Sequence, residues 1–127
     1  DTPAILFWGD DFMKPYPHQP DIIVPLADER MDLKVKLASC HECQYFDWMY
    51  WPHHTERIDW PREKQVAMLN ERYHAGSQAE ADRLRGKLTE LYGVESAAKI
   101  RNVETYEISE YSGPIDEEFL TIAKSVE

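Results

Sequence analysis

The pattern of apolar and polar residues predicts three short strands. Residues 4–8 (Ala-Ile-Leu-Phe-Trp) and 21–25 (Asp-Ile-Ile-Val-Pro) are apolar runs flanked by turn residues. Pro25 ends the second strand or places it at a sheet edge, because proline has no amide hydrogen to donate. Residues 102–111 are rich in β-branched and aromatic side chains and form the third predicted strand. The prolines within residues 13–20 predict an extended loop between the first two strands.

Apolar residues at helical spacing predict a first helix over residues 28–50. Its inward stripe is expected to contain four residues, with three more beside them: Leu33, Leu37, Cys40 and Gln44, then Met31, Val35 and Ala38. A second helix is expected to begin at Asp59-Trp60-Pro61, where an Asx residue precedes a proline in the first turn. The residues predicted to face inward on this helix are Val66, Leu69 and Tyr73.

The pattern then predicts a break and further helices. Ala75-Gly76 is expected to end the second helix, because glycine is unfavourable in a helix interior. Ser77-Gln78-Ala79-Glu80 has the spacing of a capping box, so we expect a third helix to begin there and to end before Gly93. A helical turn at residues 94–100 and an amphipathic helix at residues 115–126 complete the prediction.

Three short strands are too few for a parallel sheet that is covered on both faces. We therefore expect the sheet to contain strands from another segment of polypeptide. The sequence also begins at Asp1, without methionine, and leads directly into the apolar run at residues 4–8. Together these features indicate a piece of a longer α/β protein.

Composition and charge narrow the class of protein. The chain has 127 residues, of which 43% are hydrophobic and 12% aromatic, and this argues for one folded domain and against disorder. With 14 basic and 24 acidic residues, the net charge of −10 disfavours binding to nucleic acid and to anionic lipid. No apolar run reaches the roughly 20 residues of a membrane span, and no signal peptide is recognisable. We expect a cytoplasmic protein.

The two cysteines stand in the segment Cys40-His41-Glu42-Cys43. This spacing allows two thiolates to share a metal ion or to form a disulfide. A structural zinc site would need two more ligands, and His53 and His54 are the nearest candidates. The alternative is that both cysteines are small, partly buried residues on a helix. A small metal or redox protein is therefore one hypothesis.

Two separated segments of the sequence resemble a known family. The strand Pro20-Asp21-Ile22-Ile23-Val24 leads into a helix with Lys34, and His41 and Gln44 follow at matching spacing. Val103-Glu104-Thr105-Tyr106 is similar to a second family segment, which precedes a turn and a final helix. These patterns resemble the C-terminal part of the PIG-L/LmbE family of zinc-dependent N-deacetylases.

The resemblance implies a fold and a set of partners. Residues 1–50 and 97–127 would form the C-terminal part of a Rossmann-like three-layer α/β domain, and residues 51–96 would be a mostly helical insertion. The implied partners are the N-terminal part of the same enzyme, a small N-acylated sugar-type substrate and further copies in a homo-oligomer. Cys43 stands where the family usually has serine, so the match is incomplete there.

The family's activity depends on a His-Pro-Asp-Asp motif and a later histidine, which bind zinc. The metal activates a water molecule, an aspartate of the motif acts as base, and the amide of an N-acetylated sugar is cleaved. In this chain Gly9-Asp10-Asp11 lacks a preceding His-Pro, and residues 17–21 have a different order. We therefore expect no catalytic residue and no zinc ligand here, and no activity of the chain alone.

His41, Gln44 and Lys34 are the residues that the resemblance places near the substrate pocket. On a continuous helix, His41 shares a face with Leu37 and Gln44, so its ring is expected to point into the domain. A buried histidine bonded to the backbone is the alternative. Gln44 would anchor the helix to a loop. Lys34 could reach a neighbouring carboxylate, although an exposed lysine is the ordinary outcome.

The sequence also allows a different class of function. An aromatic-rich patch in the sequence contains Trp51, Pro52, His53, His54 and Trp60. Such a patch suits stacking on a sugar ring, or packing within or between chains. The chain could therefore be a free-standing, mostly helical protein-interaction module. Cooperative unfolding of the isolated chain without zinc would support this alternative.

Overall fold

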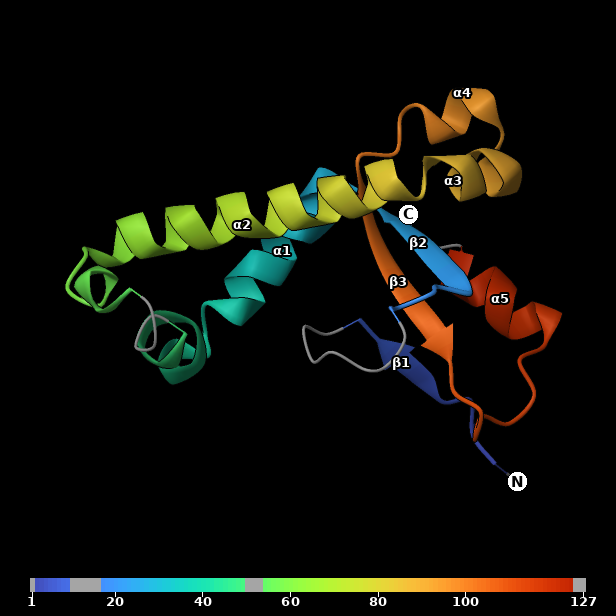
Figure 1. Ribbon diagram of the computed structural model, residues 1–127, viewed down its shortest axis with the longest axis horizontal. Helices are drawn as coiled ribbons and strands as arrows, with labels where there is room; N and C mark the ends of the chain where they lie inside the picture. Colours follow the sequence, from blue (N-terminus) through green and yellow to red (C-terminus); the bar gives the residue numbers. More distant parts are fainter. Residues whose placement is uncertain (1, 10–16, 50–53, 125–127) are drawn as a thin grey trace.

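The computed structural model describes residues 2–9, 17–49 and 54–124. The strands are β1 (Leu6–Trp8), β2 (Ile22–Leu26) and β3 (Asn102–Ile108). The α-helices are α1 (Asp28–Ala38), α2 (Arg62–Arg83), α3 (Arg85–Tyr92), α4 (Val94–Ala97) and α5 (Glu117–Lys124). A π-helical segment spans Cys43–Trp48 and a 3-10 turn spans Thr55–Arg57. The long helix α2 extends beyond the sheet alongside α1 (Figure 1).

β3 is the central strand of a three-stranded antiparallel sheet with the order β1-β3-β2. Leu6 lies opposite Ile108, and Ile22 lies opposite Tyr106. The assumption of parallel strands is therefore wrong, and the three strands pair with one another. An antiparallel sheet can be stable with helices on one face, so the argument from parallel strands does not apply to it. The chain is a mixed α/β protein.

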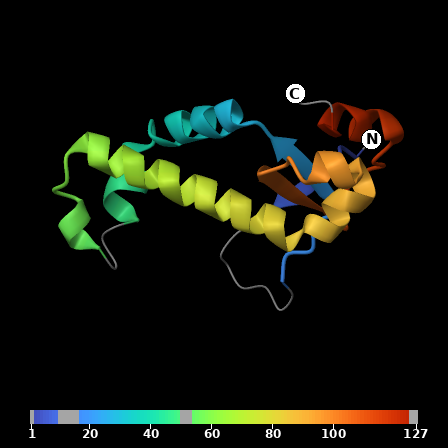
Figure 2. The same ribbon diagram turned by 90° about the horizontal axis from the view of Figure 1, so that it is seen from above.

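Two buried clusters hold the elements together. The first joins the strands to the helices of the C-terminal half and contains Ile23, Ala81, Leu84, Leu88, Ala97 and Val103. The second lies between α1, the π-helical segment and α2 and contains Val35, Ala38, Phe46 and Leu69. Removal of these side chains from water is the main favourable contribution to folding. α2 and α3, which lie within the predicted insertion, thus share a core with the strands, and Figure 2 shows them beside the sheet.

The inner face of α1 agrees with only part of the predicted stripe. Met31, Val35 and Ala38 are buried, whereas Leu33 and Leu37 are 43% and 60% exposed. The buried and exposed sets are two positions apart, which is a rotation of roughly 200° about the helix axis. Both sets are apolar at helical spacing, so the pattern alone cannot choose between them. Packing of α1 against α2 selects the first set.

α1 also ends earlier than predicted. It stops at Ala38, and the π-helical segment starts at Cys43, so the predicted continuous helix is interrupted. The Ser39 hydroxyl donates to the Val35 carbonyl at 2.8 Å, and the His41 amide donates to the Ala38 carbonyl at 3.0 Å. This turn changes the direction of every side chain that follows.

α2 is longer than predicted, because Gly76 does not end it. The helix starts directly after Pro61, as predicted, and runs without interruption to Arg83. A glycine inside a helix costs only about 1 kcal/mol relative to alanine, and the packing of Leu69 and Ala81 offsets this cost. Ser77 consequently lies in the helix interior, not at the predicted capping position.

Gly93 connects α3 to α4 with a φ of +78°, in agreement with its predicted place after a helix end. We expect Gly93→Ala to lower the free energy of unfolding by about 1 kcal/mol, because a side chain is strained in this backbone conformation.

Gly86→Ala is the matched control, since Gly86 lies within α3 and an added Cβ would meet no heavy atom within 4 Å. This change should raise the free energy of unfolding by about 0.5 to 1 kcal/mol. Urea unfolding measures both variants, and equal effects would contradict the explanation.

The remaining predicted elements are present. Pro25 lies on β2, which is an edge strand, as predicted. α5 begins at Glu117, within the predicted range 115–126, although residues 125–127 lie outside the described part of the chain. No described helix is both long enough and apolar enough to cross a membrane.

Candidate functional site

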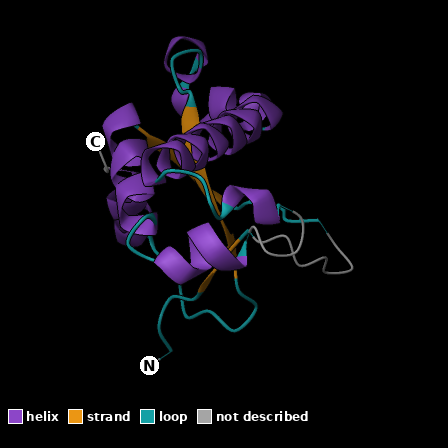
Figure 3. Cartoon of the chain, turned by 90° about the vertical axis from the view of Figure 1, so that its left-hand side faces the viewer, coloured by secondary structure: helices purple, strands orange, loops and turns teal. Residues whose placement is uncertain are grey.

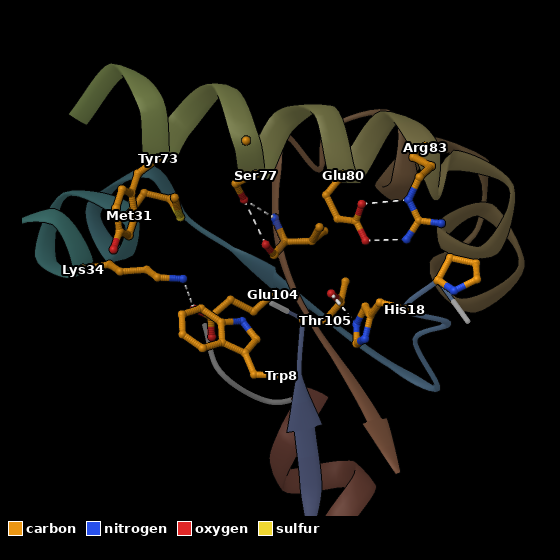
Figure 4. A pocket seen from close by; sticks show the side chains of 14 residues that line it. Trp8, His18, Met31, Lys34, Tyr73, Ser77, Glu80, Arg83, Glu104 and Thr105 are labelled. Atoms are coloured by element: carbon orange, nitrogen blue, oxygen red, sulfur yellow. Dashed lines mark hydrogen bonds and ion pairs between the residues drawn. The ribbon is translucent and has the colours of Figure 1, made fainter. Parts of the chain in front are cut away.

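A cavity of about 580 Å³ lies between α2 and the β1–β3 side of the sheet. α1 borders one side of this cavity, and the chain segment that contains His18 borders the other (Figure 4). The charged or titratable groups on its walls include His18, Lys34, Glu80, Arg83 and Glu104. These groups come from four separate parts of the sequence, which the fold brings together.

The cavity exists because β1 is shorter than β3. β1 pairs only with residues 106–108, so in the described chain the edge of β3 before Tyr106 has no strand on that side. α2 crosses over this edge. The Ser77 hydroxyl of α2 donates to the Val103 carbonyl and accepts from the Val103 amide, both at 2.9 Å. Ser77 thus replaces a strand partner, and the space beside it forms the cavity.

A half-buried ion pair lies on the cavity wall. Lys34 of α1 donates to Oε1 of Glu104 on β3, and the Tyr106 hydroxyl donates to Oε2 of Glu104 at 2.7 Å. Burial alone would raise the pKa of Glu104, but the two hydrogen bonds and the charge of Lys34 outweigh it, so this pKa lies below its usual value. Burial and the bond to Glu104 raise the pKa of Tyr106 to about 12. Glu104 is therefore ionised and Tyr106 neutral at neutral pH.

Aromatic rings surround the ammonium group of Lys34. Its Nζ lies 4.7 Å from the centre of the Trp8 ring and 5.6 Å from that of Tyr73. At these distances a cation is attracted to the ring face. The Tyr73 hydroxyl donates to the Tyr45 hydroxyl at 2.7 Å. Trp8 remains 58% exposed, so part of its surface faces solvent at the edge of the cavity.

A second ion pair lies on the α2 wall. Arg83 donates from Nε to Oε2 of Glu80 at 2.8 Å, and from Nη2 to Oε1 at 2.5 Å. These two hydrogen bonds lower the pKa of Glu80 and raise that of Arg83. On the adjoining wall, the His18 ring lies 3.2 Å from the Thr105 hydroxyl and 3.1 Å from a carboxylate oxygen of Glu107. The two Arg83–Glu80 hydrogen bonds and the two contacts of the His18 ring hold these polar side chains at fixed positions.

The structure places one of the three predicted site residues in the cavity. Lys34 lines it and has a carboxylate partner. His41 and Gln44 are exposed and do not line it. The expected inward orientation of His41 is wrong, because α1 ends at Ala38 and His41 lies in the turn that follows.

The sequence does not predict four of the residues that line the cavity: Trp8, His18, Glu80 and Arg83. Glu80 and Arg83 carry a usable signal, because opposite charges three positions apart form a pair on a helix. The capping-box pattern instead assigns Glu80 to a helix start. The strand pattern predicts a buried Trp8, and no pattern along the chain shows that His18 lies beside β3.

The cysteines and acidic residues that could bind a metal ion do not form a site in the described structure. The described residues contain no group of three or more His, Cys, Asp or Glu side chains that could hold a metal ion. Cys40 and Cys43 are exposed and not joined by a disulfide. Several residues considered for metal binding or for the aromatic patch lie outside the described part of the chain: Asp10, Asp11, Trp51, Pro52 and His53.

Comparisons of the chain with protein-family models, with curated proteins and with solved structures find no match. The residues of the cavity themselves indicate what it can bind. The Ser77 hydroxyl is used by the backbone of Val103 in both directions. The other polar side-chain groups of the described lining are two ion pairs, an imidazole and the hydroxyls of Thr105 and Tyr73, beside an exposed indole. Such a set can hydrogen-bond to a polar ring and stack on it.

Proposed function

We propose that this chain forms part of the substrate pocket of a zinc-dependent N-deacetylase that resembles the PIG-L/LmbE family. The enzyme would remove the acyl group from an N-acetylated sugar-type substrate. The metal ligands and the catalytic base would belong to the N-terminal part of the same enzyme, so that this chain alone is inactive. In this proposal the three-stranded sheet belongs to a larger Rossmann-like three-layer domain of a cytoplasmic homo-oligomer.

The observation that carries the proposal is the contact between Lys34 and Glu104. The two residues are 70 positions apart in the sequence. Each belongs to one of the two segments that resemble the family, and their ion pair lines the cavity. Two of the residues that carry the resemblance, Lys34 and Glu104, therefore meet in the candidate ligand site. His41 and Gln44 do not line it.

The shape and lining of the cavity also support a sugar-type ligand. Its volume of about 580 Å³ is in the range of pockets for small molecules. Sugars present hydroxyl groups around their edge and C–H groups on their faces. The charged side chains can bond to the former, and the exposed part of Trp8 can pack against the latter.

Zinc is not assigned to the residues of this cavity. Its imidazole and carboxylate groups are His18, Glu80 and Glu104. Each is bonded to another side chain, and they do not form a metal-binding group in the described structure. The zinc of the proposed enzyme would thus be held entirely by another part of the protein.

Native purification of the protein from its source, followed by mass spectrometry, tests the proposal. We expect a polypeptide segment with His-Pro-Asp-Asp, either continuous with this chain or bound to it. The preparation should release acetate from an N-acetylglucosamine conjugate, stop after zinc chelation and recover when zinc is returned. Isolation of these 127 residues alone, without acetate release, would overturn the proposal.

A free-standing protein-interaction module is the second candidate function. Exposed apolar side chains favour it, since Leu37 and Trp48 are 60% and 61% exposed. The same purification distinguishes the two candidates. A monodisperse chain that unfolds cooperatively, holds no zinc and has no His-Pro-Asp-Asp segment would support the module.

A further inference from the structure

We propose that Glu80 and Arg83 of α2 make the cavity selective for uncharged, hydroxyl-rich rings and exclude charged ones. The inference rests on the proposed function, because it takes the cavity as the substrate pocket. α2 lies within residues 51–96, which do not share the family resemblance. The selectivity would therefore be a property of this chain and not of the family as a whole.

The charges that line the cavity cancel in pairs. Lys34 is paired with Glu104, and Arg83 is paired with Glu80. The first pair joins α1 to β3, while the second lies on α2 at another wall of the cavity (Figure 4). His18 is bonded to Thr105 and to Glu107, which lies beyond the lining. Apart from the His18 imidazole, the described side chains that line the cavity therefore have no net charge.

Among the described residues, a charged ligand would find no unpaired countercharge on these walls. A carboxylate or phosphate that accepts from Arg83 or Lys34 would lie beside the carboxylate of Glu80 or Glu104 and be repelled by it. An ammonium group that donates to Glu80 or Glu104 would be repelled by Arg83 or Lys34 in the same way. Attraction to one member of a pair is thus offset by repulsion from the other, while the ligand charge loses hydration, so both signs of charge are disfavoured.

A hydroxyl group avoids this problem, since it can donate to a carboxylate oxygen and accept from a cation at the same time. The Lys34 ammonium uses one N–H for Glu104, and the Arg83 guanidinium uses two for Glu80. In the part of the chain that the structure describes, their other N–H groups have no hydrogen-bond partner, so they can bind a ligand without any change to the pairs. A ring with several adjacent hydroxyls fits this arrangement of alternating donors and acceptors.

Glu80 and Arg83 decide the selectivity because their pair is the more accessible of the two. The Arg83 and Glu80 side chains are 51% and 27% exposed, whereas those of Lys34 and Glu104 are 25% and 22% exposed. Figure 4 shows the Glu80 carboxylate on the cavity side of α2, where it meets the guanidinium of Arg83. Replacement of Glu80 by glutamine keeps its shape and removes one negative charge. Arg83 would then present an unpaired positive charge to the cavity.

Titration of the chain with three ring compounds tests the inference. The probes are methyl β-D-glucopyranoside, which is uncharged, D-glucuronate, which is anionic, and D-glucosamine, which is cationic. NMR shifts of the Trp8 indole and of the β3 amides report binding. The wild type should bind the uncharged ring about tenfold more tightly than either charged ring, and Glu80→Gln should bind D-glucuronate about tenfold more tightly than the wild type does.

Asp82→Asn is the matched control. It removes a carboxylate from the exposed Asp82–Arg85 pair on the outer side of the same helix end, away from the cavity lining. All three affinities should stay at the wild-type values. A gain of D-glucuronate binding in Glu80→Gln cannot result from unfolding.

Three results would overturn the inference: equal binding of charged and uncharged rings by the wild type, an unchanged preference in Glu80→Gln, or no binding of the uncharged ring. The titrations use this chain alone. Failure to find a His-Pro-Asp-Asp segment would contradict the proposed deacetylase without affecting them, so the two failures are distinguishable.

Discussion

Lys34→Met is expected to lower the free energy of unfolding by about 2 to 3 kcal/mol at pH 7. Methionine keeps most of the aliphatic stem beside Trp8 and Tyr73 but has no ammonium group. Glu104 would remain ionised and half-buried, with the Tyr106 hydroxyl as its remaining hydrogen-bond donor in the described structure. Loss of one partner of a fully buried pair costs roughly 3 to 5 kcal/mol. The expected value is lower because both side chains keep some contact with water.

The pH dependence of this effect follows from the lowered pKa of Glu104. A carboxyl group whose pKa is lowered by folding contributes stability above its unfolded pKa, and this contribution is lost as the pH falls through its folded pKa. Without Lys34, burial raises the pKa of Glu104 above the ordinary value of 4.5. The difference between wild type and Lys34→Met should therefore be largest near pH 7. It should shrink as the pH falls, first when Glu104 of the variant takes up a proton and then when that of the wild type does.

Arg101→Ala is the control for the loss of a surface charge. Arg101 pairs with Asp28, and their side chains are 65% and 44% exposed. A pair of this kind contributes less than about 1 kcal/mol. Urea unfolding at pH 7 and pH 4 compares the three proteins. If Lys34→Met costs no more than Arg101→Ala, or costs the same at both pH values, the Lys34–Glu104 pair does not have the role described.

Ser77→Ala is expected to lower the free energy of unfolding by about 2 kcal/mol. The substitution leaves both the amide and the carbonyl of Val103 without the hydroxyl that satisfies them. Each unpaired, buried polar group costs about 1 to 3 kcal/mol, and water that enters the cavity recovers part of this loss. Amide hydrogen exchange should show faster exchange at Val103, while the amides of α3 remain protected.

Ser39→Ala is the control for Ser77→Ala, because it removes a hydroxyl that satisfies no backbone amide. The Ser39 hydroxyl donates to the Val35 carbonyl, four residues before it. Its loss leaves no backbone amide unpaired, so the change in free energy should be below about 0.5 kcal/mol. Unchanged protection of the Val103 amide in Ser77→Ala would refute the idea that Ser77 stands in for a strand partner.

Features that depend on neighbouring residues could be predicted from the sequence. The short apolar runs lead to β1 and β2, the residues after Asp59-Trp60-Pro61 begin α2, and Gly93 ends α3 with a positive φ. In each case the physical cause lies within a few residues of the feature. No distant contact is needed for these local signals to set the bounds of a strand or helix. They are an apolar run between turn residues, a proline in a first turn and a glycine after a helix.

Features that depend on packing could not be predicted in the same way. The choice between Leu33 and Val35 as an inward residue of α1, and the continuation of α2 through Gly76, are both decided by tertiary contacts. The cavity also depends on packing between elements that are distant in the sequence. The sequence pointed to Lys34 and to the segment around Glu104, but Glu80 reaches the same cavity only because α2 crosses the uncovered edge of β3.

The central position of β3 has a consequence for how the chain is made. Both of its neighbours, β1 and β2, lie within the first 26 residues, whereas β3 begins at Asn102. A ribosome releases the chain from its N-terminus, so these two strands emerge long before their common partner. Pairing over such a separation in sequence is slow and leaves strands unprotected in the meantime. During synthesis, the sheet and the cavity beside it therefore cannot assemble until β3 has left the ribosome, which happens after α1 to α4 have emerged.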